Sequence, residues 1–383
     1  MKYRKVVKFF KKPHLFTRDY LNKRFPIDRY ELPLSAQNEQ AVMDFCEFVE
    51  ETTLNNGYDF PIDVVFTWAG TQGVEKAAQF LGSLGSQENL ANYATDPMRF
   101  LDNNELQFAV NSVLCNMSWV RKIYIVSDDE VPDFIQKLSY NEQQKIQVIA
   151  HKQIIEEQYL PTFNSHVIEA HLHKIPDLSE HFIYFNDDII PARPLRRTHF
   201  FQTNGLAILF ASNKSLINIE KTYNDPKKAA GKTATMQANI NVYRLLKQKY
   251  PQWAFDTLLV HSAKALTKSG FEQAWYLFEN EIKAFLPNKF RSINDLNVAA
   301  FLVPHLLYAE KKALFWTELC DYFDIAIPMA NTHYKNLLHK KHIGFKPHAI
   351  CVNTYRSDNI SPFFQKNLHE FLNTYFNVAN EKL

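Results

Sequence analysis

The stretch LPTFNSHVIEAHLHKIPDLSEHFIYFNDD, residues 160–188, decides the fold because it joins a short helical segment to an apolar strand with a polar end. The strand is expected at 182–185, and Asn186, Asp187 and Asp188 follow it directly. In an open α/β sheet, ligands bind at the carboxyl ends of the strands. Two adjacent carboxylates without a neighbouring cation suit a hard divalent metal ion such as Mg²⁺, which in turn suits phosphates. This stretch therefore predicts a polar ligand site at a strand end.

The first half of the chain alternates strands with helices. Helical spacing predicts helices at 36–54 and 104–117. Such alternation is typical of a mainly parallel, doubly wound α/β sheet, Rossmann-like or GT-A-like, covered on both faces. The other strands that short β-branched runs predict are 62–67, 123–127 and 146–150.

The strand signal weakens after about residue 207, and helical spacing predicts helices at 233–250, 262–285 and 294–309, with a last strand within 343–352. We therefore expect a helical lobe beside the sheet. The predicted divisions are a basic N-terminal arm (1–35), a catalytic domain (36–355) with its helical lobe at about 207–342, and a C-terminal helix (356–383).

Length and composition exclude several classes of protein. A chain of 383 residues with 46% hydrophobic residues can bury a large core, which argues against disorder. It has only 9 glycines and neither a GxGxxG nor a GxxxxGK[ST] loop, so classical dinucleotide and P-loop sites are disfavoured. No apolar run reaches the roughly 18 residues of a membrane span, and lysines interrupt the N-terminus, so we expect a cytoplasmic protein. The widely spaced cysteines predict reduced thiols rather than a zinc site: Cys46, Cys115, Cys320 and Cys351.

The net charge of +2 hides a basic segment at the N-terminus. Residues 1–26 hold nine Lys or Arg against Asp19 alone, which gives +8 and leaves −6 for the other 357 residues. Interleaved with Val and Phe, this segment suits an anionic membrane surface, which attracts each Lys or Arg by about 1 kcal/mol. Peripheral binding to the inner face of the cytoplasmic membrane is one expectation. A solvated basic helix docked on its own domain is the other, and we expect no nucleic-acid partner.

Two residues of the first strand have candidate roles. Burying the Asp63 carboxylate unpaired is costly, so it either caps a backbone segment or contacts a ligand. Trp68 ends the strand, where a base or a sugar can stack, and a core position is its alternative.

The segment before the helix at 104–117 combines a cation with acids. Asp102 suits the helix N-cap with Glu105 at capping-box spacing. Arg99 has no such local role, so its guanidinium is a candidate for phosphate binding.

The decisive stretch itself places Asn164, Ser165 and His166 at the start of a helix, where anions are favoured. Glu169 lies one turn after His166, so both face the same way.

Candidates in the second half of the chain are more scattered. His261 follows an apolar run, which predicts an oriented imidazole or, alternatively, a core histidine. Lys289 and Arg291 precede Asp295 at a helix entry, which suits a diphosphate or a capped loop. Asn353 ends the last predicted strand.

Taken in order, these segments resemble the Stealth family of sugar-1-phosphate transferases, which includes bacterial capsular polysaccharide phosphotransferases. The similarity covers roughly residues 60–355, and its most specific part lies between residues 99 and 194. The quoted segments that carry it are IDVVFTW, RFLDNNELQFAVNSV, LPTFNSHVIE, FIYFNDD, NKFRSINDLN and HAICVN.

The chain departs from the family pattern in two places. Trp68 is followed by Ala-Gly-Thr where relatives have Val-Asp-Gly, and Asn353 is followed by Thr354 where relatives have Asp. If the missing acid after Asn353 holds metal in relatives, another group such as Asp358, or water, takes its place here.

The resemblance implies that an acceptor hydroxyl attacks the sugar-bearing phosphorus of a UDP-sugar, most simply a UDP-N-acetylhexosamine, and that UMP leaves. It implies Mg²⁺ or Mn²⁺ on Asp187 and Asp188, with Asp63 as a further ligand, and a polysaccharide or oligosaccharide acceptor. His261 is the candidate general base, with Asp188 as its rival. The remaining implied roles are diphosphate binding by Arg99, Arg291 and Lys289, a sugar pocket of Asn164, Ser165, His166 and Glu169, and substrate contacts from Trp68, Asp102, Glu105, Asn186, Asp295 and Asn353.

Two other classes of function remain open at this point. A metal-dependent glycosyltransferase would use the same acids but release UDP instead of UMP. A non-catalytic protein of polysaccharide assembly would show no turnover.

Overall fold

The computed structural model describes residues 60–83, 89–225, 231–252, 256–354, 357 and 360–376, and single positions before residue 60. Most of the helix predicted at 36–54 and most of the basic arm lie outside the described residues. The division of the chain into arm, domain and C-terminal helix therefore stays a prediction.

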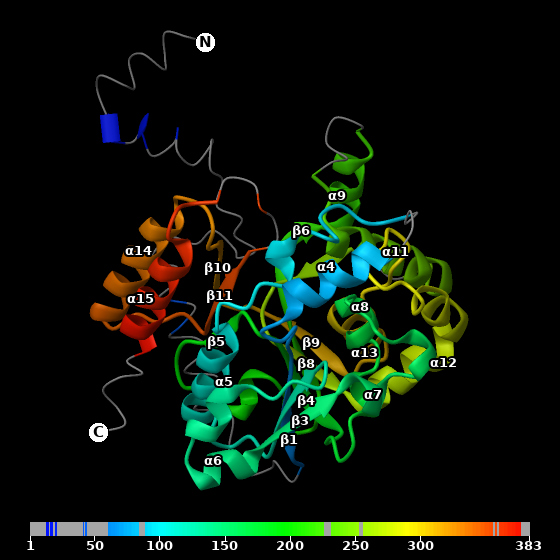
Figure 1. The fold of residues 1–383 in the computed structure, drawn as a ribbon. Helices are drawn as coiled ribbons and strands as arrows, with labels where there is room; N and C mark the ends of the chain where they lie inside the picture. The colour runs from blue at the N-terminus through cyan, green and yellow to red at the C-terminus, as the bar shows by residue number, and fades with distance from the viewer. Residues whose placement is uncertain are drawn as a thin grey trace.

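A five-stranded sheet in the order β3-β2-β1-β4-β8 lies at the centre of the molecule (Figure 1). The first four of these strands are parallel, and β8 pairs with β4 in the antiparallel direction. The predicted mainly parallel α/β sheet and its four predicted strands are confirmed. The bounds are β1 (Ile62–Thr67), β2 (Ile123–Ser127), β3 (Ile146–Ala150), β4 (His181–Asn186) and β8 (Lys264–Thr267).

Helices cover both sides of this sheet, with α5 on one side and α8, α12 and α13 on the other (Figure 1). The strands are buried on both faces, which explains why β1 and β4 are runs of apolar residues without alternation. The α-helices of the described chain are α4 (Gly73–Ser83), α5 (Glu105–Asn116), α6 (Tyr140–Lys145), α7 (His151–Ile154), α8 (Ser165–Glu169), α9 (Leu216–Tyr223), α11 (Ala234–Lys249), α12 (Lys268–Phe285), α13 (Val303–Ala309), α14 (Ala330–His342) and α15 (Phe364–Phe376). Short 3₁₀ turns lie at η1 (Pro97–Arg99), η2 (Asp133–Lys137), η3 (Glu157–Tyr159), η4 (Leu172–Lys174) and η5 (Arg197–His199), and η6 (Val298–Leu302) is a π-helical turn before α13.

The start of α5 differs from the predicted capping box. The N-cap is Asn104, with a left-handed φ of 61° and no side-chain cap, and the helix begins at Glu105. Asp102 instead accepts from the Asn104 backbone N–H at 2.9 Å, and Glu105 accepts from the Asn103 backbone at 2.8 Å. The prediction of Asp102 as the helix cap was therefore wrong, because this local turn takes up its carboxylate.

The range 207–342 contains more strands than its helical spacing indicates. It adds β8 to the central sheet and forms a three-stranded sheet, β7-β6-β9, of its own. Another small sheet, β10-β11-β5, joins the last strand to the segment after Asp188. Helical spacing missed β6 to β10, most of which are short, whereas the last strand predicted within 343–352 is present as β11. The bounds of the strands in the two small sheets are β5 (Ile189–Pro191), β6 (Ala207–Ser215), β7 (Thr257–Leu259), β9 (Ala313–Trp316), β10 (Cys320–Asp324) and β11 (Ala349–Asn353).

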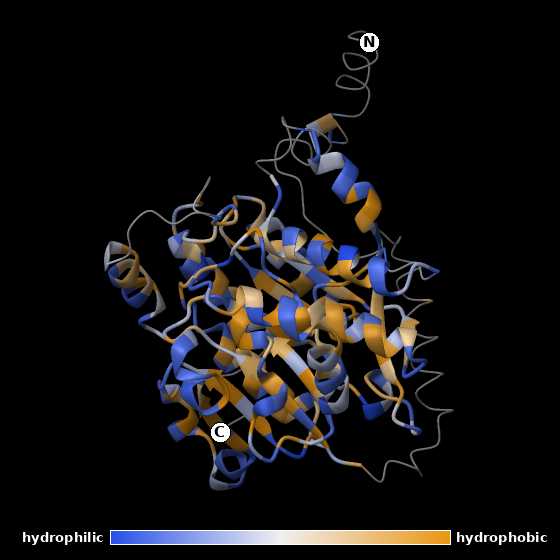
Figure 2. Ribbon diagram, turned by 90° about the vertical axis from the view of Figure 1, so that its right-hand side faces the viewer, coloured by the Kyte–Doolittle hydropathy of each residue, from blue (hydrophilic) through white to orange (hydrophobic). Residues whose placement is uncertain are grey.

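One large apolar core joins the sheets and helices, and it includes Leu368 and Phe371 of α15. Hydrophobic segments concentrate along the inner strands and helix faces, whereas hydrophilic ones dominate the periphery (Figure 2). Within the described residues, no helix combines the length and the apolar character that a membrane span requires. Cys320 and Cys351 are buried free thiols and Cys115 is an exposed one, while Cys46 lies outside the described residues.

Candidate active site

A cavity of about 300 Å³ opens at the carboxyl ends of β1 and β4. Thr67 and Trp68 reach it from β1, and Asn186, Asp187 and Asp188 reach it from β4. A smaller polar cavity of about 80 Å³ adjoins it and shares Asp187 and Asp188. The ligand site predicted from the end of β4 therefore coincides with the main cavity.

Four carboxylates surround the smaller cavity. Asp102, Glu105, Asp187 and Asp188 all line it. Burial raises the pKa of Asp187 well above its usual value, and the charges of Asp188, Glu105 and Asp102 add to the effect. Burial likewise raises the pKa of Glu105 to about 7. Burial and neighbouring negative charges thus disfavour the ionised forms of Asp187 and Glu105, which is the condition under which a bound cation stabilises a site.

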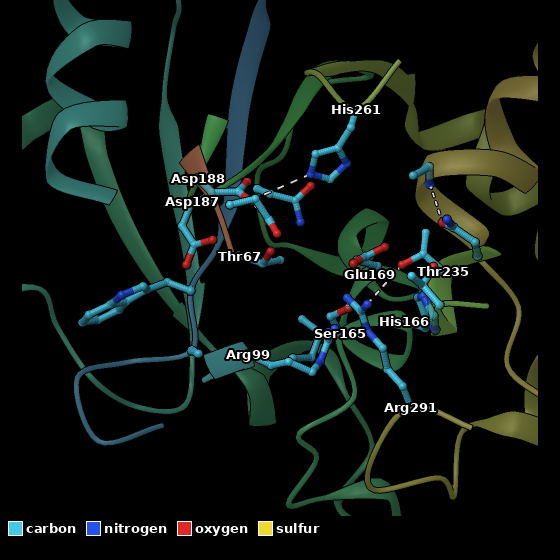
Figure 3. Close-up of a pocket in the computed structure, with 18 of the residues that line it drawn as sticks. Thr67, Arg99, Ser165, His166, Glu169, Asp187, Asp188, Thr235, His261 and Arg291 are labelled. Atoms are coloured by element: carbon cyan, nitrogen blue, oxygen red, sulfur yellow. Dashed lines mark hydrogen bonds and ion pairs between the residues drawn. The ribbon is translucent and has the colours of Figure 1, made fainter. Parts of the chain in front are cut away.

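Asp188 is the centre of the arrangement (Figure 3). Its Oδ2 atom accepts a hydrogen bond from the Asn353 side chain and lies 3.9 Å from Nε2 of His261. Its Oδ1 atom is buried and has no hydrogen-bond partner among the described residues. β11 pairs with β5, directly after Asp188, and this pairing brings Asn353 to the carboxylate. Asp188 therefore has one oxygen that the described protein leaves for a ligand.

The donor set of this site fits a hard divalent cation. Asp187 and Asp188 supply carboxylate oxygens, the ligands that Mg²⁺ and Mn²⁺ prefer. A sulfur donor is also close, since Cys351, Asp188 and His261 have potential ligand atoms within 4.8 Å of one another. Burial and the nearby Asp188 raise the pKa of the Cys351 thiol well above its usual value, so the sulfur is a neutral thiol. Because a bound metal ion would itself remove a proton from a coordinating thiol, it is the carboxylate pair, and not the thiol pKa, that favours an oxygen-ligated ion.

Two arginines line the opposite side of the main cavity. Arg291 donates from Nη2 to Ser165 Oγ at 2.7 Å and from Nη1 to Thr235 Oγ1 at 3.1 Å. Burial lowers the pKa of Arg99 and of Arg291, and in Arg99 the charge of Arg291 adds to the effect. Neither forms an ion pair within 4.0 Å with a carboxylate of the described chain. Such closely placed buried cations are typical of an anion site.

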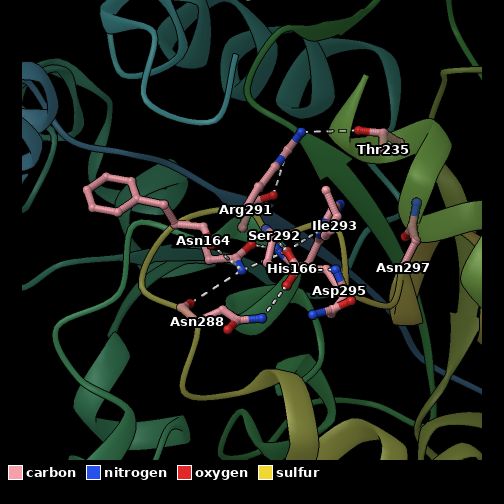
Figure 4. Close-up of polar contacts among 12 residues, drawn as sticks. Asn164, His166, Thr235, Asn288, Arg291, Ser292, Ile293, Asp295 and Asn297 are labelled. Carbon is pink, nitrogen blue, oxygen red and sulfur yellow. Dashed lines mark hydrogen bonds and ion pairs between the residues drawn. The ribbon is translucent and has the colours of Figure 1, made fainter. Parts of the chain in front are cut away.

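A buried polar network holds this arginine side in place (Figure 4). Asp295 is fully buried and accepts hydrogen bonds from His166 Nδ1 at 3.0 Å and from Asn164 Nδ2 at 2.8 Å. Asn164 in turn caps α8 by accepting from the His166 backbone at 3.1 Å. His166 lines the cavity, whereas Asn164 and Asp295 lie behind it. These two residues, which we predicted to bind substrate, therefore orient the cavity wall from behind.

The structure gives Asp63 a role different from the predicted metal ligand. It lies near the amino end of β1, lines neither cavity, and pairs with Arg121 at 2.9 and 2.5 Å. The backbone N–H of Ser179 donates to it at 2.7 Å, so its buried charge is already satisfied. Lys289 also fails to reach the cavity, because its ammonium donates to the Leu160 carbonyl oxygen at 3.1 Å. Both residues therefore stabilise the fold and stay out of the proposed site.

Most of the remaining predicted residues meet in the main cavity, whereas Asp102 and Glu105 line only the smaller one. Figure 3 shows Ser165, Glu169 and Arg291 together, across from Asp187, Asp188 and His261. Residues that line the main cavity as predicted are Trp68, Arg99, Ser165, His166, Glu169, Asn186, Asp187, Asp188, His261, Arg291 and Asn353.

Sequence reasoning missed several residues of the cavity. Lys264 lies in β8, where its apolar neighbours conceal it, and burial lowers its pKa to about 8. Thr235 was part of an expected helix, although its hydroxyl binds Arg291. A cation inside an apolar strand was the available signal for Lys264. At the second departure from the family pattern, Thr354 lines both cavities, and Asp358 lies outside the described residues.

An α/β sheet with a carboxylate pair and two buried arginines at its strand ends is typical of enzymes that act on phosphorylated substrates. The family model "Stealth protein CR2, conserved region 2" matches residues 99–209. The chain is 45% identical over 379 residues to the capsular polysaccharide phosphotransferase fcs1 of Haemophilus influenzae, covering 97% of this chain and 100% of that one. It is 43% identical over 383 residues to a capsular polysaccharide phosphotransferase of Neisseria meningitidis serogroup B, covering 100% of both chains. The chain therefore belongs to the Stealth family of phosphotransferases.

Solved structures that resemble the chain are more distant. Mouse xyloside xylosyltransferase 1 has a TM-score of 0.35 and 10% identity over 77% of this chain and 97% of that one. An active-site mutant of LgtC has a TM-score of 0.36 and 8% identity over 80% and 94%. At these values, the likeness carries no argument about mechanism.

Proposed function

We propose that this protein is a capsular polysaccharide phosphotransferase that moves sugar-1-phosphate from a UDP-sugar to a hydroxyl of a glycan. The observation that supports this proposal is a single cavity in which a carboxylate pair lies across from two buried arginines. The chain that forms it is similar over its whole length to capsular polysaccharide phosphotransferases. The transferred group is an N-acetylhexosamine-1-phosphate. The product is a phosphodiester between that sugar and the acceptor.

The reaction breaks one P–O bond and forms another. The acceptor hydroxyl oxygen attacks the phosphorus that bears the sugar, and the bond from this phosphorus to the bridging oxygen breaks. UMP leaves with the bridging oxygen and the electron pair. The hydroxyl proton passes to the imidazole of His261, and the Asp188 carboxylate, 3.9 Å from its Nε2 atom, stabilises the resulting imidazolium.

The arginines hold the diphosphate while this exchange takes place. Arg99 and Arg291 are already desolvated, so their charges act on the phosphoryl oxygens with little screening. Hydrogen bonds to Ser165 and Thr235 fix the Arg291 guanidinium, so the guanidinium is already in position before the substrate binds. Phosphoryl transfer needs little covalent help beyond such positioning and charge neutralisation.

Asp187 and Asp188 would hold Mg²⁺ or Mn²⁺, and this ion would neutralise charge on the diphosphate. Glu169, Ser165 and His166 would line the sugar pocket between the metal ligands and the arginines. Trp68 and Asn186 would contact the donor from the strand ends.

The nucleotide that is released tests this proposal. Purified protein is incubated with a panel of nucleotide-sugars, Mg²⁺ and a glycan acceptor, and the nucleotides are separated by chromatography. UMP is the expected product. UDP would identify a glycosyltransferase instead, and no release with any donor would favour a non-catalytic protein of polysaccharide assembly.

The protein would work at the inner face of the cytoplasmic membrane, with the basic arm of residues 1–35 on anionic lipid. Electrostatic binding of this kind weakens with salt, because exposed charges are screened beyond about 8 Å at physiological ionic strength. A chain that begins at Ile27 should no longer sediment with anionic vesicles at low salt. Equal sedimentation of both forms would reject the arm as an anchor.

A further inference from the structure

Lys264 is a buried cation that the proposed reaction leaves without a role. It is only 7% exposed, and its ammonium donates to the carbonyl oxygens of Val260 at 2.7 Å and Ser262 at 2.5 Å. These carbonyl groups belong to the residues on either side of His261. Burying an ammonium is costly unless hydrogen bonds satisfy it. Here both hydrogen bonds that the ammonium donates within the described residues go to the turn that carries the candidate base.

That turn is held by further contacts. The Ser262 backbone N–H donates to the Val260 carbonyl oxygen at 2.9 Å, which closes a three-residue turn with His261 at its centre. The Cys320 thiol donates to the His261 carbonyl oxygen at 3.5 Å. Three consecutive carbonyl groups therefore accept hydrogen bonds from side chains of β8 and β10. This arrangement, Lys264 and Cys320 on the carbonyls of 260–262, is called the carbonyl clamp below.

The clamp fixes the backbone from which the imidazole projects. His261 follows β7, and its ring meets Tyr322 edge-on with centroids 5.5 Å apart. On its other side, Nε2 lies 3.9 Å from Asp188 Oδ2. A general base must lie within hydrogen-bond distance of the proton that it abstracts. Small backbone shifts at this turn would therefore lower the catalytic rate.

The groups around Lys264 do not give it another ion-pair role. Glu318 and Glu169 are the nearby carboxylates, but no carboxylate of the described chain lies within 4.0 Å of its ammonium. Glu318 is already bound by His199 at 3.0 Å and by His348 at 2.6 Å. Lys264 also lines the main cavity, so direct binding of the diphosphate is the alternative that an experiment must separate.

We propose that Lys264 is a positioning residue that acts through His261, by holding the carbonyl groups on both sides of it. This inference rests on the proposed function, since it takes His261 as the group that accepts the hydroxyl proton. Lys264 itself need not touch the donor or the acceptor.

The first test needs no substrate and therefore stands apart from the proposed function. The imidazole signals of isotope-labelled His261 are assigned by NMR from their loss in His261→Gln. Lys264→Met should shift or broaden them, and Lys264→Gln, which keeps one donor group, should have a smaller effect. Lys289→Met is the matched control, because Lys289 also donates to a carbonyl group but outside the cavity, and it should leave the His261 signals unchanged. Unchanged His261 signals in folded Lys264→Met would overturn the proposal.

The second test separates positioning from diphosphate binding. Lys264→Met should lower kcat by roughly 10-fold or more while the KM for the nucleotide-sugar stays within about threefold, since the clamp acts on a catalytic group. In a His261→Gln background, the same substitution should add little further loss, because coupled residues are not additive. A raised KM with unchanged kcat, or equal losses in both backgrounds, would overturn the proposal. If the wild-type protein releases no nucleotide, the proposed function fails and the NMR result alone decides the clamp.

Discussion

Asp63 and Asp188 are both buried aspartates of the central sheet, at opposite ends of neighbouring strands, and they differ in what surrounds them. Asp63, at the amino end of β1, accepts hydrogen bonds from Arg121 and from the Ser179 and Lys122 backbones. Asp188, after the carboxyl end of β4, has an oxygen without a partner among the described residues and a second acid beside it. The first carboxylate is satisfied by the fold, whereas the second lines the main cavity with one oxygen that has no hydrogen-bond partner among the described residues. The comparison teaches that surroundings, and not burial alone, separate a structural acid from a functional one.

Removing either acid of the pair should have the largest effect on activity. We expect Asp188→Asn and Asp187→Asn to lower turnover by roughly 10³-fold, because an amide cannot supply the charge that a divalent cation requires. The folded state should be as stable as wild type or more so, since Asp187 loses an unfavourable buried charge. Turnover and thermal unfolding measured on the same preparations check both parts. Near-wild-type turnover in both variants would end the assignment.

His261→Gln should have the next largest effect. We expect kcat to fall by roughly 10²-fold, the usual scale for general acid–base catalysis, with little change in donor affinity. Steady-state kinetics and direct binding of the nucleotide-sugar measure the two quantities. Lost affinity with intact turnover would make His261 a binding residue.

For Asp63, the comparison predicts that a substitution lowers the stability of the fold without lowering turnover. Asp63→Asn should lower the free energy of unfolding by on the order of 2 kcal/mol, because it breaks a buried ion pair. This loss is smaller than that expected for a fully buried ion pair, because the Arg121 side chain is 38% exposed and solvent partly screens its charge. Denaturant unfolding measures the loss, and turnover per folded molecule should match wild type. If turnover of Asp63→Asn no longer depended on the metal ion, Asp63 would be a metal ligand after all.

The stabilisation that Mg²⁺ provides should also distinguish Asp188 from Asp63. At about 100 times its Kd, the ion should stabilise the wild type and Asp63→Asn by about 2.7 kcal/mol and leave Asp188→Asn unaffected. The pKa of Glu105 is raised to about 7 and that of Asp187 is also raised by burial, so both groups gain protons as the pH falls. Stabilisation by Mg²⁺ should therefore weaken from about pH 8 to about pH 6. Thermal scans with and without a chelator measure it, and a pH-independent shift would contradict the carboxylate site.

The sequence predicted the parts of the site that follow from local pattern. The apolar run before Asn186 indicated the strand, and the structure places Asp187 and Asp188 at its end, where they line the main cavity. Asp63 shows the limit of this reasoning. Its partner Arg121 is 58 positions away, and only the pairing of β1 with β2 brings them together.

Other parts of the site depend on contacts that no local pattern contains. Lys264 lies in a four-residue strand within a range of helical spacing, and the carbonyl groups it binds are known only from the fold. Asn164 and Asp295 have the polar character of binding residues, yet their side chains hydrogen-bond to each other in a buried network. The Asn164–Asp295 contact spans 131 positions, so the sequence pattern could not show it. The bonds of Lys264 span only 2 and 4 positions, but they depend on the turn at 260–262, which the predicted helix at 262–285 did not contain.

The path of the β-phosphorus of the donor tests the central claim most directly. A UDP-sugar radiolabelled at this phosphorus is incubated with the wild-type protein, Mg²⁺ and a glycan acceptor, with Asp188→Asn as the inactive control. We predict that the label moves into the glycan product and that unlabelled UMP is released, because the bond that breaks lies between the two phosphorus atoms. Label retained in UDP, with an unlabelled glycan product, would contradict sugar-1-phosphate transfer.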